Sequence, residues 1–210
     1  MKKLKSSLLN MFLSLTLTCV LAGALLATVN DITQAPISAA KKEKLNLAIK
    51  EVAPQYNNSP TDEAYMSAIS AGDSLKIYPA KWNGELVGAA VESNSNQGFS
   101  GMIKVIVGLD AEGKLLNYKV LEHAETPGLG SKMEDWFRAA NHTVVGKNLA
   151  TTVLKVSKDD GDIDAITAAT ISSRAFLNAV NRAYMAFSGK TADTDSATEA
   201  TTSASGKVKH

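Results

Sequence analysis

The chain has 210 residues, of which 45% are hydrophobic and 20% are charged, and its formal net charge is +1. This length accommodates one medium-sized domain with extensions, and the near-neutral charge gives no reason to expect a polyanionic partner. Five Phe and two Trp are too few and too scattered to form a stacking surface for bases, so we expect no nucleic-acid partner.

The amino-terminal segment has the composition of a single membrane span. Three lysines within residues 1–5 precede an uncharged run, residues 6–30, which is longer than the roughly 20 apolar residues that cross a bilayer. A cleavable signal peptide is the alternative, because residues 22–24 are small, as signal peptidase requires. We favour a retained anchor, since the apolar run continues past these residues, with residues 1–5 in the cytoplasm.

Residues 31–74 are expected to connect this span to a folded domain. Apolar residues on one helical face predict a short amphipathic helix over 41–52, ended before Pro54. Residues 55–74 are polar and weakly patterned, which predicts a loop with one helical turn at 64–69.

Residues 75–187 have the pattern of an α+β domain built on antiparallel hairpins. Asn83-Gly84 separates two apolar runs and predicts a hairpin, because both residues tolerate positive φ. Strands at 102–109 and 115–122 predict a second hairpin.

Three further elements and a tail complete the prediction. We expect a short helix at 134–140, a strand at 151–157 that ends in an Asp/Gly turn, and a helix at 172–187. The last helix has an apolar stripe that faces a core. Residues 188–210 contain almost no large apolar side chains, which predicts a disordered tail.

The acidic residues and histidines lack the spacing of a metal site. Asp160, Asp162 and Asp164 alternate, but Ala165 and Ile171 occupy the positions where a calcium loop needs Gly and Glu. No two histidines are three or four residues apart. We therefore predict no metal site, and we identify no hydrolase motif and no catalytic residue.

Two short stretches have unusual composition. In ETPGLGSK, residues 125–132, Pro127 restricts the backbone while Gly128 and Gly130 allow a tight turn or close approach to a flat ligand. DAITAATISSRAF, residues 164–176, places hydroxyl side chains before a helix, where they are ordinary N-caps.

The same helix start could also hold a phosphoryl group. A helix N-terminus supplies free N–H groups and a partial positive charge, which favour a phosphate. Small residues at 168 and 169 leave room beside Thr170, so a phosphate ester there would need no lysine or arginine.

ETPGLGSK, followed about forty residues later by DxxTAATISS, resembles the FMN-binding domain of membrane redox complexes. With one amino-terminal span, the chain is similar to the G subunits of Rnf electron transport complexes, and secondly to the C subunits of sodium-translocating NADH:quinone reductase. The resemblance implies FMN held covalently by a phosphoester bond to a threonine, installed by a flavin transferase with FAD as donor.

The resemblance also assigns residues to the cofactor. The motif of the flavin transferase falls on Asp164, Thr167, Ala168, Ala169, Thr170 and Ser172. Thr170 would be the modified residue, and Ala168 stands where glycine is usual. Residues Glu125, Thr126, Gly128 and Leu129 would border the isoalloxazine ring.

By the same resemblance, the chain would relay electrons inside a complex that oxidises ferredoxin, reduces NAD and moves sodium ions or protons outward. Its partners would be the other membrane subunits, the flavin transferase and membrane lipid. The chain would cross the bacterial inner membrane once, with its C-terminal domain in the periplasm. Two alternatives remain open: a membrane-anchored binding module without cofactor, which Ala168 favours, and a flavin carrier for another extracytoplasmic electron route.

Overall fold

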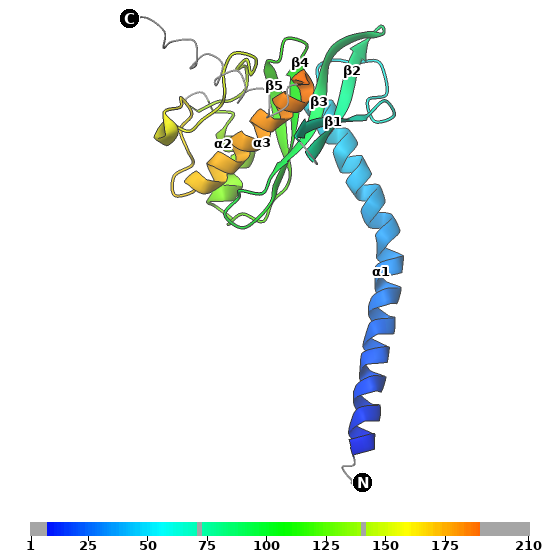
Figure 1. Cartoon of the computed structure of the whole chain (residues 1–210). Coiled ribbons are helices and arrows are strands. Elements are labelled where there is room, and N and C mark those ends of the chain that lie inside the picture. Colours follow the sequence, from blue (N-terminus) through cyan, green and yellow to red (C-terminus); the bar gives the residue numbers. More distant parts are fainter. Residues whose placement is uncertain (1–7, 71–72, 140–141, 190–210) are drawn as a thin grey trace, which may run out of the picture. The chain divides into compact units, whose positions relative to one another are not determined.

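One long helix, α1, runs from Leu8 to Val52 (Figure 1). The computed structural model describes residues 8–70, 73–139 and 142–189, so the predicted N-terminus at 1–5 and nearly all of the predicted tail lie outside it. Of the described helices, α1 is long and apolar enough to cross a membrane, judged by length and composition. Two units are distinguished, Met1–Leu45 and Asn46–His210.

The predicted helix over 41–52 and its end before Pro54 are confirmed, but the predicted break before it is wrong, because α1 continues without interruption through Pro36. A proline inside a helix removes one backbone hydrogen bond. The alanines at 35, 39 and 40 have the highest helix propensity of any residue and favour continuation on both sides.

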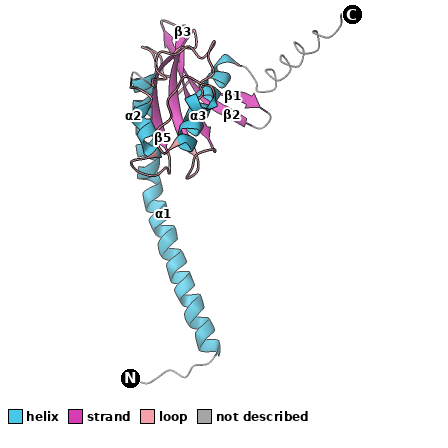
Figure 2. Cartoon of the chain, turned by 90° about the vertical axis from the view of Figure 1, so that its left-hand side faces the viewer, coloured by secondary structure: helices cyan, strands magenta, loops and turns pink. Residues whose placement is uncertain are grey.

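Five strands form one antiparallel sheet in the order β1-β2-β3-β4-β5, coloured magenta in Figure 2. Their bounds are β1 Tyr65–Ser70, β2 Asp73–Trp82, β3 Glu85–Ser95, β4 Ile103–Asp110 and β5 Leu115–Glu122. Both predicted hairpins are confirmed. Asn83 and Gly84 have φ of 53° and 88°, as the primed turns of two-residue hairpins require.

Strand β1 occupies the segment where we predicted a helical turn, and it begins before the predicted domain start at 75. The pairing of β1 with β2 overrides local propensity here, from Tyr65 opposite Ile77 to Ser70 opposite Asp73. The Ser67 hydroxyl also donates to the Ala186 carbonyl oxygen at 2.7 Å. This edge strand is therefore held by tertiary contacts that its sequence does not reveal.

The predicted strand at 151–157 is absent from the described structure. Val156 makes only an isolated bridge to Ile163. The side chain of Asn181 accepts from the Leu154 N–H at 3.0 Å and donates to the Leu154 carbonyl at 2.9 Å. A helix side chain thus satisfies the backbone groups that a neighbouring strand would otherwise pair.

The final helix, α3, spans Thr170–Ser188 and lies on one face of the sheet (Figure 1). Its apolar stripe is buried in the main core, as the sequence predicts. Phe176 stacks on Phe137 with ring centroids 4.6 Å apart, and meets Tyr118 edge to face at 4.8 Å. The Ser93 hydroxyl of β3 donates to the Ala179 carbonyl at 2.7 Å inside this core. Helix and sheet together confirm the α+β class.

The predicted helix at 134–140 is shorter in the structure. A 3₁₀ turn, η1 Gly130–Lys132, leads into the single turn α2 Met133–Trp136. A second 3₁₀ turn, η2 Ser157–Asp159, precedes the predicted Asp/Gly turn, in which Asp160 has φ of 59°.

The last turns of α1 pack on the sheet at β4. Ala48, Ile49 and Val52 are buried, and the backbone of Val52 comes so close to Gly108 that a side chain there has no room. The Asn117 amide of β5 also donates to the Glu51 carbonyl at 3.3 Å.

This close approach predicts that Gly108→Ala is destabilising. A Cβ at Gly108 would lie 1.8 Å from the Val52 carbonyl oxygen, and overpacking of this kind costs about 1–3 kcal/mol. Urea unfolding of the full chain in detergent, followed by tryptophan fluorescence, should show that loss. An unchanged midpoint would mean that Val52 does not pack on β4.

Candidate functional site

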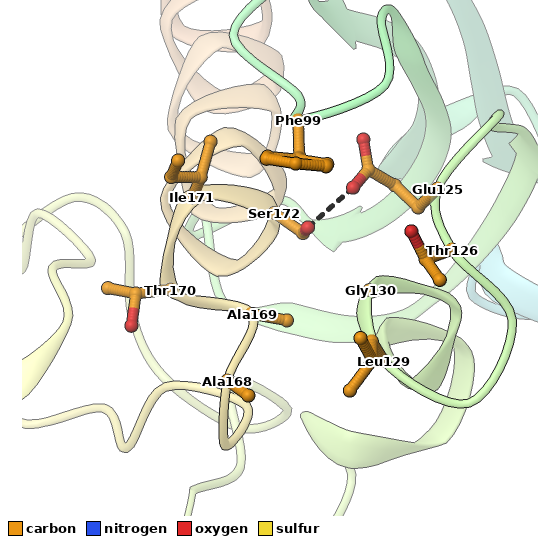
Figure 3. Close-up of a pocket in the computed structure, with 10 residues that line it drawn as sticks. All are labelled: Phe99, Glu125, Thr126, Leu129, Gly130, Ala168, Ala169, Thr170, Ile171 and Ser172. Atoms are coloured by element: carbon orange, nitrogen blue, oxygen red, sulfur yellow. Dashed lines mark hydrogen bonds between the residues drawn. The ribbon is translucent and has the colours of Figure 1, made fainter.

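A pocket of about 360 Å³ lies at the N-terminus of α3 (Figure 3). Its lining comes from three separate parts of the chain: the loop after β3, the segment 125–132 and the segment 164–176. The lining residues are Phe99, Glu125, Thr126, Leu129, Gly130, Ala168, Ala169, Thr170, Ile171 and Ser172. We call this the ring pocket. The two stretches that the sequence singled out therefore meet at one site.

Glu125 joins these segments through buried hydrogen bonds. Its carboxylate accepts from the Ser172 hydroxyl at 2.5 Å and from the Ser100 N–H at 3.0 Å. Both Glu125 and Ser172 are almost fully buried. A buried carboxylate must be hydrogen-bonded to be tolerated, so this pair fixes the loop 125–132 against the first turn of α3.

Two glycines make room for that carboxylate. A Cβ at Gly130 would lie 2.6 Å from Ser172 Oγ and 2.8 Å from Glu125 Oε2. A Cβ at Gly98 would lie 2.7 Å from Glu125 Oε1. The second glycine of ETPGLGSK is therefore required for close approach within the protein itself.

The first glycine of that stretch, Gly128, has a different structural role, because it forms a turn. It has φ of 76° and its N–H donates to Ser131 Oγ at 2.9 Å, so it closes the turn. Gly128 does not line the ring pocket. By turning the chain there, it places Thr126 and Leu129 at the pocket wall, opposite Thr170 in Figure 3.

Helix α3 begins without the side-chain cap that the hydroxyl residues predicted. Its N-cap is Ala169, whose side chain makes no capping hydrogen bond. The Ser173 hydroxyl instead accepts from the Ile166 N–H at 2.9 Å and donates to the Ala169 carbonyl. The serine thus holds the preceding loop, and no cap side chain covers the first N–H groups of the helix, which attract an anion.

Ala168 has the backbone conformation of a glycine. Its φ is 62°, in the left-handed region that a side chain disfavours by roughly 1–2 kcal/mol. The alanine therefore preserves the turn that leads into Thr170, at the cost of local strain.

A second pocket, of about 510 Å³, lies beside Thr170. Asp164 and Thr167 line this pocket and not the ring pocket, whereas Ala168 and Thr170 line both. Its other lining residues are Trp136, His142, Ser157, Lys158, Ala165 and Ile166. The predicted motif is therefore divided between two cavities that share Thr170.

Lys158 is a cationic neighbour of Thr170, although the sequence indicated that a phosphate there would need no lysine or arginine. Its Nζ donates to Thr170 Oγ1 at 3.3 Å. The two residues are 12 positions apart and are joined by irregular chain, so sequence spacing alone could not have identified this contact.

Two other residues that line the ring pocket, Phe99 and Ile171, were missing from the prediction, and both are exposed. Gly130 was predicted to allow close approach, and it lines the pocket beside Glu125. Phe99 lies in the loop between β3 and β4, where nothing in the local sequence distinguishes it from any other loop residue.

The ring pocket has the character that a flat aromatic ligand requires. Its volume falls in the range of about 300–1,000 Å³ common for small-molecule sites. Phe99, Leu129 and Ile171 supply apolar walls, and polar atoms are confined to a few positions such as Glu125 and Thr126. These residues suit a flat, largely apolar ring, and Thr170 lies at the border of the pocket.

An ion pair fixes the loop that carries Lys158. The Arg174 guanidinium donates to both oxygens of the Asp159 carboxylate, at 2.6 and 2.7 Å. This contact holds the pKa of Asp159 below its usual value. The pair is therefore intact at any pH well above about 4, the ordinary carboxyl value, and is lost as the pH falls below the lowered pKa.

The left-handed φ of Ala168 predicts that Ala168→Gly is neutral to stabilising. Relief of about 1–2 kcal/mol of strain is offset by about 0.4–1 kcal/mol of added freedom in the unfolded chain. Thermal unfolding should therefore show an unchanged or higher Tm.

The matched control is Ala169→Gly. Ala169 has φ of −137° and is buried, so this variant should lower the Tm by losing packing and gaining unfolded-state freedom. A larger loss for Ala168→Gly than for Ala169→Gly would contradict the strained conformation.

Comparisons with known proteins place the chain in a family. Residues 98–185 match the FMN-binding domain family. The chain is 36% identical to the G subunit of the ion-translocating oxidoreductase complex of Pectobacterium atrosepticum, covering 82% of this chain and 86% of that protein. The corresponding subunit of Shewanella piezotolerans is 34% identical, covering 88% and 91%.

The corresponding subunit of Escherichia coli is 35% identical, covering 80% of this chain and 86% of that one. Among solved structures, NqrC of Shewanella oneidensis is similar with a TM-score of 0.44 and 21% identity over 58% of each chain. On its sequence relatives, the chain belongs to the family of G subunits of ion-translocating oxidoreductase complexes, as a redox subunit with an FMN-binding domain.

Proposed function

We propose that this subunit carries FMN through a phosphoester bond to Thr170 and relays electrons within its complex. The observation that carries the proposal is the position of Thr170 at the uncapped start of α3, on the border between the ring pocket and the second pocket. A phosphate on Thr170 Oγ1 would lie beside free helix N–H groups and Lys158. A flavin chain attached there could reach back over the small residues Ala168 and Ala169.

In this proposal the ring pocket binds and orients the isoalloxazine ring. Phe99, Leu129 and Ile171 offer apolar contact, and Glu125, held by Ser172, offers a fixed polar edge. Bound FMN takes up and gives back one or two electrons, which is the chemistry that a relay needs. The protein contributes position, and the covalent bond would prevent loss of the cofactor.

The wider context follows from the relatives. Their names assign them to ion-translocating oxidoreductase complexes, and we extend membership of such a complex to this chain. The family resemblance of its sequence motifs further leads us to propose electron transfer from ferredoxin to NAD, coupled to outward ion transport. Its partners would be the other membrane subunits, a flavin transferase and lipid around α1. We further infer that α1 crosses the inner membrane once, with the FMN-binding domain on the periplasmic side.

The alternative of a binding module without cofactor rested on Ala168. Because Ala168 adopts the left-handed conformation that glycine would adopt, its backbone is compatible with the motif that a transferase reads. The observation favours the flavin carrier over that alternative. It does not separate the complex described above from another extracytoplasmic electron route.

Co-expression with a flavin transferase tests the attachment. The wild-type chain should give a band that fluoresces under ultraviolet light after denaturation, and Thr170→Ala should remove the fluorescence completely because it removes the only oxygen proposed to hold FMN. Thr151→Ala, a change of the same kind at an exposed threonine outside both pockets, should keep it.

The two ways of failing are distinct. An unlabelled wild-type chain beside an active transferase would refute the carrier, whereas a fluorescent Thr170→Ala variant would refute only the attachment site.

A further inference from the structure

We propose that Lys158 is the cation that holds the phosphoryl group at Thr170, both while FMN is transferred and in the finished phosphodiester. This inference rests on the proposed attachment of FMN to Thr170. It adds a residue that lies outside the transferase motif and in a loop that the sequence marked only as a turn.

Lys158 contacts the proposed attachment residue directly. Its Nζ donates to Thr170 Oγ1 at 3.3 Å, and both residues line the second pocket. Of the described residues that line the two pockets, Lys158 is the only lysine or arginine. The Lys158 ammonium group would therefore contact a phosphate on Thr170 from the second pocket, and not from the ring pocket.

The loop under Lys158 is held on both sides. The Ser157 hydroxyl is 3.2 Å from Asp164 Oδ1, and Asp159 pairs with Arg174, one turn beyond Thr170 on the same face of α3. The Gly161 N–H also donates to the Val156 carbonyl at 3.1 Å. Because the backbone under Lys158 is already ordered, binding an anion would cost less conformational entropy than it would at a mobile loop. Lys158 is therefore pre-organised to bind an anion at Thr170.

The carboxylates nearest to Lys158 in the sequence are bonded to other residues. Asp159 accepts from Arg174, and Asp164 accepts from Ser157. Neither carboxylate accepts a hydrogen bond from the Lys158 ammonium group in the structure. That group donates instead to the uncharged Thr170 oxygen. A phosphodiester anion on that oxygen would give the ammonium group a charged partner at the same place.

The transfer step shows where this charge is needed. Thr170 Oγ bonds to the phosphorus of the FMN half of FAD, the phosphoanhydride bond breaks, AMP leaves with the bridging oxygen, and the hydroxyl proton passes to solvent or to the transferase. Nothing is oxidised or reduced. Negative charge on the phosphoryl oxygens is what a fixed cation stabilises during such a transfer, and the phosphodiester product keeps one negative charge.

The test compares labelling rates of full-length variants with purified flavin transferase and FAD. Lys158→Met should slow the initial rate about tenfold, the loss expected for one hydrogen bond between charged groups at a partly exposed site. Lys158→Arg should restore most of the rate. The matched control, Lys155→Met, removes the same charge from an exposed lysine three residues away that lines neither pocket, and it should label like wild type.

Salt provides a readout that a merely structural role would not change. Because added salt screens an exposed charge, it should slow labelling of wild type and Lys155→Met more than labelling of Lys158→Met. Equal Tm values for the variants would exclude misfolding as the cause.

Two results would overturn the role of Lys158 while leaving FMN on Thr170: Lys158→Met labelled at the wild-type rate, or Lys158→Arg as slow as Lys158→Met. A wild-type chain that takes no label at Thr170 would instead refute the proposed function.

Discussion

The site depends on one buried hydrogen bond, from the Ser172 hydroxyl to the Glu125 carboxylate. It joins the loop 125–132, which follows β5, to the first turn of α3, 47 residues further along the chain. The contact is possible only because Gly130 has no side chain to occupy the space between them. Among the described residues, this bond is the direct side-chain link between the two walls of the ring pocket.

This constraint leaves Thr170 in an unusual position. Ser172 is turned inward to Glu125 and Ser173 to the backbone of the preceding loop, so neither covers the start of α3. Ala168 accepts a left-handed φ and Ala169 caps the helix without a polar side chain. Thr170 therefore lies between an apolar pocket on one side and Lys158 on the other, which is the arrangement on which the proposed attachment of flavin rests.

Features that depend on residues close in sequence could be predicted, whereas features that depend on contacts between distant residues could not. The hairpins were predictable because turn residues such as Asn83-Gly84 act on their neighbours, and α3 because its apolar stripe is local. The strand proposed at 151–157 failed because Asn181, on a distant helix, satisfies Leu154. Phe99 and Lys158 reach the site only through the fold. The family resemblance supplied Thr170, which local rules alone would have assigned to a helix cap.

The central claim is that FMN on Thr170 places its ring in the ring pocket and its phosphate beside Lys158. A crystal structure of the flavin-loaded protein tests it most directly. We expect continuous density from Thr170 Oγ1, with the isoalloxazine ring against Phe99, Leu129 and Ile171 and a phosphate oxygen within hydrogen-bond distance of Lys158 Nζ. A ring lying instead against Trp136 and His142 in the second pocket, or density on another residue, would contradict it.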